Sequence, residues 1–187
     1  MKRLSLLFVL TFILFSSLYS QEKIKSKEVG LYFSSLDAFG IRYKFGNEKH
    51  MLRLTALSLS GGSYSNDIGN GSTQNQSSFG AGLSFGIEFP VKITDNFNFY
   101  YGGQLSTSYY YSKNETTSND ASKVNSFGGS AGFILGFMYS INSSISLSAE
   151  IVPGINYNYS KQGESTSSGF GFGLNNATAG LTLGYRF

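Results

Sequence analysis

Residues 145–159, ISLSAEIVPGINYNY, decide the fold, because apolar side chains recur along them at every second position. These apolar positions are Ile145, Leu147, Ala149, Ile151, Pro153, Ile155, Tyr157 and Tyr159. Successive side chains of a β-strand point to opposite faces, whereas a helix would repeat about every 3.6 residues. The stretch therefore predicts a long strand with one apolar face and one mainly small, polar face.

The same alternation recurs from Glu28 to the end of the chain, most clearly over 79–89 and 127–139. The segments between these stretches are of two lengths, and short and long segments follow each other in alternation along the chain. Short segments lie at 47–50, 92–96 and 140–144. Longer segments, rich in Ser, Asn, Gly and Thr, lie at 64–78, 113–125 and 161–169. Short turns at one end and long loops at the other are typical of a transmembrane β-barrel, in which the short turns are periplasmic.

Eight strands follow from these connections. They are predicted at 28–35, 38–46, 51–62, 79–90, 97–112, 126–139, 145–160 and 170–187. The first pair depends on Ser35, Leu36 and Asp37, which form either an outer turn between two strands or a bulge within one long strand. The even strand number of single-chain bacterial barrels favours the turn. The predicted fold class is thus all-β, an eight-stranded antiparallel up-and-down transmembrane barrel.

The residue types on the two faces distinguish a membrane barrel from a soluble one such as a lipocalin. The polar face carries Gly, Ser, Thr and Asn, which fit a narrow eight-stranded lumen, and few of the Lys and Glu that a water-facing exterior needs. Aromatic residues stand at both ends of the apolar face, as in the belts at membrane interfaces. Charged residues make up 13% of the chain, about half of the roughly 25% usual in soluble domains. The apolar face is therefore predicted to contact lipid.

The N-terminus has the order of a secretory signal peptide: two basic residues, an apolar run from Leu4 to Phe15, and small residues up to Ser20. The apolar run is shorter than the roughly 20 residues of a membrane-spanning helix, which argues against a transmembrane anchor. The predicted organisation is a signal peptide at 1–20, an N-terminal periplasmic lead at 21–27 and the barrel at 28–187.

Charged residues within the predicted strands fall mostly on the small-residue face. They are Arg42, Lys44, Arg53, Glu88, Glu150 and Arg186. A charge facing lipid costs roughly 2 to 4 kcal/mol at the bilayer midplane, so these side chains are expected to point into the lumen. The three arginines can then pair with the two glutamates in a lumen charge network that fills the barrel. The alternative is that the charges lie near the barrel rims, solvated and unpaired.

The chain ends with Leu183, Tyr185 and Phe187 at alternate positions, the last of them a terminal aromatic residue. This ending resembles the C-terminal assembly signal of outer-membrane barrels, which the barrel assembly machinery reads. Residues 28–187 as a whole resemble the small eight-stranded outer-membrane barrels of the OmpX/OmpA-like family. The resemblance implies the outer membrane of a Gram-negative-type bacterium as the location, with outer-membrane lipid and the assembly machinery as partners.

Candidate residues for catalysis, cofactors and metals are few. His50 is the only histidine and falls in a predicted periplasmic turn, away from the outer leaflet where barrel enzymes modify lipid. Glu88 and Glu150 could form a carboxylate pair for glycoside hydrolysis, but pairing with arginines keeps both ionised when one must be an acid. The absence of cysteine excludes a thiolate metal site and a lipid-modified cysteine. No catalytic, cofactor-binding or metal site is predicted.

The function expected from these patterns is that of a non-enzymatic outer-membrane protein of structural or surface-interaction type. Segments 64–78, 113–125 and 161–169 are expected to lie outside the cell and to present a surface to an extracellular ligand or a host. Nucleic acid is not an expected partner, because the predicted signal holds two of the 14 basic residues and no basic stripe remains. A small pore or transporter is the first alternative, and a lipid-modifying barrel enzyme is the second.

Overall fold

A computed structural model describes residues 26–34, 39–67, 73–116, 119–173 and 179–187. Its strands are β1 (Ser26–Phe33), β2 (Phe39–Gly46), β3 (Met51–Asp67), β4 (Thr73–Lys92), β5 (Phe97–Thr116), β6 (Asn119–Ser140), β7 (Ile145–Ile151), β8 (Gly154–Gln162), β9 (Ser165–Gly173) and β10 (Ala179–Arg186). No helix in the described part of the chain is long and apolar enough to cross a membrane.

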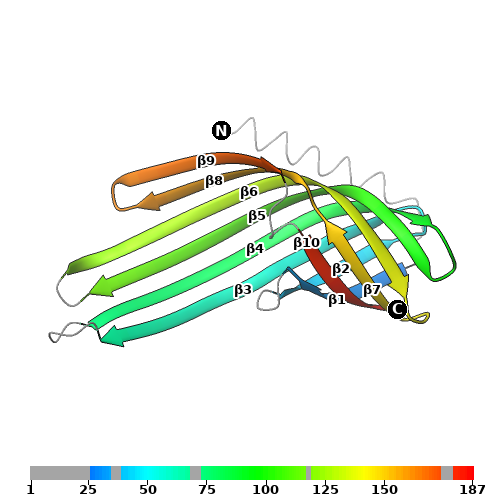
Figure 1. The fold of residues 1–187 in the computed structure, drawn as a ribbon, viewed down its shortest axis with the longest axis horizontal. Helices are drawn as coiled ribbons and strands as arrows, with labels where there is room; N and C mark the ends of the chain where they lie inside the picture. The colour runs from blue at the N-terminus through cyan, green and yellow to red at the C-terminus, as the bar shows by residue number, and fades with distance from the viewer. Residues whose placement is uncertain (1–25, 35–38, 68–72, 117–118, 174–178) are drawn as a thin grey trace.

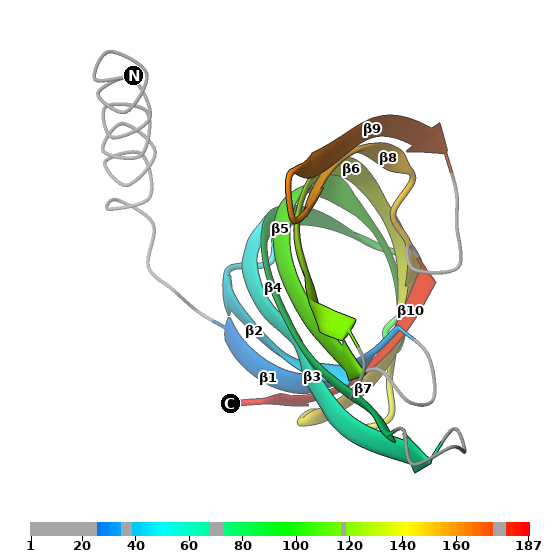
Figure 2. The ribbon, with the colours of Figure 1, turned by 90° about the vertical axis from the view of Figure 1, so that its left-hand side faces the viewer.

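The strands close into a ring in which every neighbouring pair is antiparallel. The order around the ring is β1, β2, β3, β4, β5, β6, β7, β10 and back to β1. Figure 2 shows this ring from one end, with β8 and β9 beside β6 at its upper edge. The prediction of an eight-stranded antiparallel barrel is therefore confirmed.

Two of the predicted strands are interrupted. β7 and β8 form one of them, because both pair with β6 in an unbroken register, Leu135 with Ile151 and Gly132 with Gly154. The break falls at Pro153, which has no N–H to donate to a ladder. β9 and β10 form the last predicted strand, 170–187, and residues 174–178 between them lie outside the described residues.

The three long segments predicted as loops are mostly strand, so that part of the prediction is wrong. Residues 64–78, 113–125 and 161–169 form much of the ends of the β3–β4, β5–β6 and β8–β9 hairpins. Pairing continues out to Asp67 with Thr73, Thr116 with Asn119, and Gln162 with Ser165. Strands with water on both faces need no apolar alternation, so their Ser, Asn and Gly residues looked like loop in the sequence.

The first predicted pair of strands is present, because β1 and β2 pair with each other from Ser26–Gly46 to Phe33–Phe39. The alternative of a single bulged strand is wrong. The predicted turn at residues 35–37 and the predicted signal peptide at 1–20 lie outside the described residues. β1 begins at Ser26, two residues before the predicted start of the barrel.

The two faces of the wall have opposite chemistry. Large apolar side chains such as Leu31, Leu105 and Phe133 are exposed on the outside, whereas Arg53 and Thr55 are fully buried on the inside. A protein in water would bury the first set and expose the second. Lipid around the barrel removes the contradiction, and the predicted assignment of the faces agrees with this burial pattern.

The hairpins differ strongly in length. β1 and β2 have 8 residues each, whereas β4 and β5 have 20 and β6 has 22. A tilted strand of about 9 to 11 residues crosses a bilayer, so β1 and β2 are close to the shortest strands that can span, and the longer hairpins extend past the bilayer. Figure 1 shows these hairpins projecting together to one side. We call the projecting part the outer wall: β3 from Gly61, β4 up to Gly82, β5 from Ser106, β6 up to Ser130, β8 and β9.

Candidate functional site: the lumen

Arg53 crosses the lumen. It lies on β3, is fully buried, and its Nη1 donates to Glu88 Oε1 of β4 at 2.8 Å and to Glu150 Oε2 of β7 at 2.7 Å. β3 and β7 are four strands apart in either direction around the ring, so the Arg53–Glu150 contact joins opposite sides of the barrel. Arg53 Nη2 also donates to Gln104 of β5.

Glu150 is the acceptor at the centre of this arrangement. Arg42 of β2 donates to both of its oxygens, from Nη1 at 3.0 Å and from Nη2 at 2.8 Å. Tyr100 of β5 donates its hydroxyl to Oε2 at 3.1 Å. The carboxylate thus accepts from β2, β3 and β5, which bridges the lumen in several directions.

Arg42 is held on its other side by two hydroxyl groups. Its Nε donates to Thr55 Oγ1 at 3.0 Å and its Nη1 to Thr182 Oγ1 at 2.9 Å. Thr55 and Thr182 lie on β3 and β10, the strands on either side of the β1–β2 pair. These bonds fix the plane of the guanidinium, so that its fork faces Glu150.

A second group of charges lies between this centre and the end of the barrel with short turns. Lys44 Nζ lies 3.0 Å from Glu88 Oε2 and 3.8 Å from Glu28 Oε1. Arg186 Nη2 lies 3.3 Å from Glu28 Oε2. The ion pairs therefore form one chain from Arg42 to Arg186. We call it the lumen charge cluster, made up of Glu28, Arg42, Lys44, Arg53, Glu88, Glu150 and Arg186.

The structure brings four of the five residues of the predicted network together: Arg42, Arg53, Glu88 and Glu150. The fifth, Arg186, pairs with Glu28, which the sequence analysis did not single out, and is joined to the other four only through Lys44. Lys44 was placed on the inner face there but not in the network. Glu28 lies four residues before the inward-facing Tyr32 on β1, and side chains an even number of residues apart on a strand share a face. This spacing is the signal that could have identified Glu28.

Two tyrosine–glycine contacts pack beside the charges. A Cβ on Gly136 would lie 2.3 Å from the ring of Tyr100, and one on Gly180 would lie 2.2 Å from the ring of Tyr32. Each ring therefore occupies space that only glycine leaves free. Arg42 lies 4.2 Å from the centroid of the Tyr32 ring, and Lys44 lies 5.1 Å from that of Tyr100. Both rings thus close the lumen and add cation–π attraction to the buried cations.

The balance of charge explains how so many ions can be buried. Removing an ion from water costs several kcal/mol, and only well-placed counter-charges and hydrogen bonds offset that cost. Every carboxylate of the cluster faces at least one cation within 3.3 Å. Among the described residues, Arg53 Nε is the buried side-chain nitrogen that lacks a hydrogen-bond partner. Nearly every buried polar atom of the cluster therefore has a hydrogen-bond or ion-pair partner, which favours a rigid filling of the lumen.

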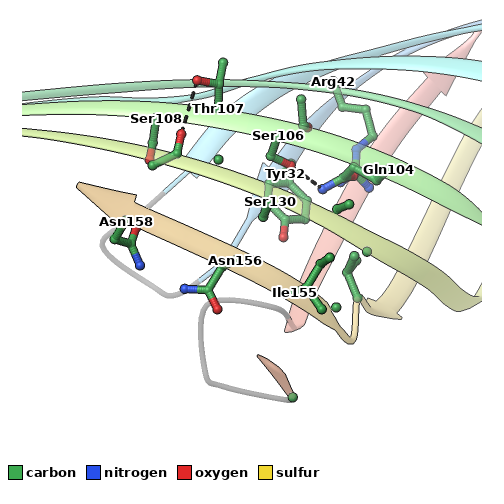
Figure 3. A pocket seen from close by; sticks show the side chains of 18 residues that line it. Tyr32, Arg42, Gln104, Ser106, Thr107, Ser108, Ser130, Ile155, Asn156 and Asn158 are labelled. Atoms are coloured by element: carbon green, nitrogen blue, oxygen red, sulfur yellow. Dashed lines mark hydrogen bonds between the residues drawn. The ribbon is translucent and has the colours of Figure 1, made fainter. Parts of the chain in front are cut away.

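On the outer side of Arg42 the lumen is no longer filled by charged side chains. A cavity of about 280 Å³ lies there, with Tyr32 and Arg42 at its inner end. Its sides are formed mainly by Gly, Ser, Asn and Gln residues of β4, β5, β6 and β8. Figure 3 shows Gln104 and Ser106 on one side and Asn156 and Asn158 on another. We call this space the outer cavity.

The remaining candidate residues lie elsewhere. His50 lies in the β2–β3 turn, where its backbone N–H donates to Asn47 Oδ1 at 3.1 Å. Leu183 and Tyr185 of β10, and Phe187 after it, are exposed on the outer surface. The described residues contain no group of three or more His, Asp or Glu side chains placed to hold a metal ion.

No protein-family model matches the sequence, and no curated protein matches it. The fold is similar to that of a major outer membrane protein from Thermus thermophilus, with a TM-score of 0.52, 10% identity and coverage of 89% of this chain and 100% of that one. It is also similar to the N-terminal β-barrel domain of Pseudomonas aeruginosa OprF, with a TM-score of 0.43, 14% identity and coverage of 88% and 100%.

A further similar structure is Ail of Yersinia pestis in complex with the heparin analogue sucrose octasulfate, with a TM-score of 0.41, 14% identity and coverage of 89% and 100%. At these identities the comparison bears on the fold. The predicted fold class, an all-β, eight-stranded antiparallel barrel, is confirmed by the closed eight-stranded ring, and the likeness to the Thermus protein agrees with it. What this barrel does has to be argued from its own residues.

Proposed function

We propose that this chain is a non-enzymatic outer-membrane protein of a Gram-negative-type bacterium, of structural or surface-interaction type. Its membrane-spanning part is a rigid barrel filled by the lumen charge cluster. Its outer wall is the part that meets extracellular partners. The protein is exported with the signal peptide at 1–20, and the assembly machinery reads Leu183, Tyr185 and Phe187 at the C-terminus.

The observation that carries this proposal is the Arg53–Glu150 contact of 2.7 Å between opposite walls, with both side chains almost wholly buried. A small eight-stranded barrel is only just wide enough for its inward side chains. Arg42, Tyr100 and Gln104 occupy the space beside that contact. Such a cross-section leaves no room for a continuous column of water, which disfavours the pore alternative.

The enzyme alternative lacks a suitable set of groups. Both Glu88 and Glu150 are ion-paired with arginine and therefore cannot supply the protonated carboxyl that glycoside hydrolysis requires. His50 lies at the end of the barrel with short turns, whereas the outer cavity lies on the other side of the charge cluster. A surface role for the outer wall needs neither group.

Planar-bilayer recording tests the proposal against the pore. We expect the purified protein to insert without stable, regular conductance steps, because the charge cluster closes the lumen. Insertion is checked on the same sample by heat-modifiable gel mobility, since a closed barrel keeps its backbone hydrogen bonds in detergent until heated. Steady single-channel steps from the unmodified protein would overturn the proposal in favour of a pore.

The same proposal predicts that the outer wall is dispensable for folding. Replacing residues 64–78, 113–125 and 161–169 by short turns should leave the heat-modifiable mobility and the outer-membrane fractionation unchanged, because the ring closes without them. Adhesion of the expressing cells to host surfaces should fall with each exchange that removes a contact surface. Recovery of the intact protein in the soluble periplasmic fraction would contradict the membrane location.

A further inference from the structure

The inner surface of the outer wall can be assigned from the strand register, because residues paired across two strands share a face. Gly80 of β4 is buried toward the lumen and pairs with Tyr110 of β5. Tyr110 in turn pairs with Ser126 of β6, whose hydroxyl lies 2.9 Å from that of Ser160 on β8. Tyr110 and its neighbours on three strands therefore face the space above the outer cavity.

This inner surface is polar and uncharged. Beyond Arg42, the described inward-facing side chains of the outer wall are hydroxyl, amide, aromatic or apolar groups. Six that matter here are Tyr64, Gln76, Tyr110, Asn114, Asn156 and Asn158. The lysines of the same hairpins occupy the intervening strand positions and therefore face outward. They are Lys113, Lys123 and Lys161. The separation of charge from the inner surface means that a charged ligand would find no counter-charge there.

Two amides stand free in the outer cavity. Asn156 and Asn158 of β8 line it, and neither side chain has a hydrogen-bond partner among the described residues. Each amide lies against a glycine on the neighbouring strand, which makes room for it: a Cβ on Gly171 would lie 2.6 Å from Asn156 Oδ1, and one on Gly128 would lie 3.0 Å from Asn158 Oδ1. Each free amide offers two N–H donors and one carbonyl acceptor to a ligand.

We propose that the outer cavity and the inner surface of the outer wall bind a neutral oligosaccharide, which gives a ligand class to the surface-interaction function on which this inference rests. A sugar presents closely spaced hydroxyls that both donate and accept, as do the amides and serines here. Its C–H faces stack on aromatic rings such as Tyr110 and Tyr64. A cavity of about 280 Å³ accommodates the end of such a chain, and the wall accommodates the rest.

The test uses the full-length mature protein in phosphatidylcholine nanodiscs, which contain no sugar head group. Maltohexaose and chitohexaose are the neutral probes, and a heparin-derived hexasaccharide is the anionic comparison. We expect the neutral probes to shift the side-chain amide NMR signals of Asn156 and Asn158 in a saturable way, and the heparin fragment to leave them unshifted. Saturable shifts with the heparin fragment alone would overturn the inference, and so would the absence of shifts both with the neutral probes and with a neutral glycolipid.

A matched pair of variants separates recognition from folding. Tyr110→Ala should weaken binding about fivefold or more through loss of the ring contact. Tyr109→Ala is the control, because Tyr109 and Tyr110 are each 43% exposed but Tyr109 faces outward and bonds to Asn125. The control should change affinity less than about twofold. Equal weakening by both variants, with heat-modifiable mobility retained, would contradict the assignment of the binding surface.

The source of the sugar is distinguished by a second arm with digalactosyl diacylglycerol added to the nanodiscs. Shifts with the free hexasaccharides support a glycan from outside, and shifts with the glycolipid alone support a sugar anchored in the same membrane. The absence of NMR shifts both with the free sugars and with the glycolipid refutes the inference. The proposed function is still supported in that case if planar-bilayer recordings show no conductance steps. Steady conductance would refute the proposed function whatever the sugars do.

Discussion

The two halves of the lumen share the strands β3 to β6 and differ in what fills them. Tyr100 and Tyr110 lie on the same face of β5, yet Tyr100 is 2% exposed and donates to Glu150, whereas Tyr110 is 43% exposed. In the membrane-spanning half, the ring is closed and charges pair across it. In the outer half, the inner surface of the wall is uncharged and surrounds a cavity. Charge is thus concentrated where the ring is narrow enough for every ion to reach a partner.

The largest effect should come from breaking the charge cluster. Glu150→Gln keeps the shape of the side chain but leaves Arg42 and Arg53 without their shared carboxylate. Removing one partner of a buried ion pair costs roughly 3 to 5 kcal/mol. The urea midpoint of folding into lipid vesicles, followed by heat-modifiable mobility, should fall accordingly. An unchanged midpoint would mean that water solvates the cluster and that the two halves do not differ as described.

An exposed ion pair supplies the control for that variant. Asp95 lies in the β4–β5 turn, 2.7 Å from Lys92, and both side chains are largely in water. The hydrogen bond from Lys92 and its positive charge lower the pKa of the Asp95 carboxyl below its usual value. Any stability from this pair is present above the usual aspartate pKa and is lost as the pH falls below it. Asp95→Asn should leave the urea midpoint at neutral pH unresolved from that of the parent protein.

The next largest effect tests the outer face against the outer cavity. Leu105 is 58% exposed on the apolar exterior, and Ser106 beside it lines the cavity. Leu105→Lys places a charge in lipid at a cost of up to about 2 to 4 kcal/mol, depending on depth. Ser106→Lys places the same charge in the outer cavity and should fold with nearly the parent yield. Folding yield into vesicles measures both, and equal yields, or a lower yield for Ser106→Lys, would contradict the assignment of inside and outside.

A smaller effect is expected from the packing of Tyr100. Gly136→Ala introduces a methyl group into the space of the ring, and overpacking of this kind costs typically about 1 to 3 kcal/mol. Gly129→Ala on the same strand is the control, because its Cβ would meet nothing within 4 Å. The control should be neutral or slightly stabilising. Equal urea midpoints for the two variants would show that the packing of the Tyr100 ring does not require the space left by Gly136.

The barrel and the identity of its two faces could be predicted without a structure. Alternation such as that of residues 145–159 has the period of a strand, and the aromatic and small residues on opposite faces separate lipid from lumen. The parity of Arg42, Arg53, Glu88 and Glu150 placed them inside for the same local reason. These inferences need one strand at a time, which is why they could be drawn without a structure.

Tertiary structure alone decided which inward groups meet and how far the hairpins extend. Arg53 is 97 residues from Glu150 in the chain, and their contact depends on the number of strands and on the register between them. The register of β3 also shifts between Leu57 and Ser60, which changes the face of later residues such as Tyr64 in a way that simple alternation misses. Outside the bilayer no solvent difference marks the two faces of a strand, so the sequence could not tell the outer wall from loops.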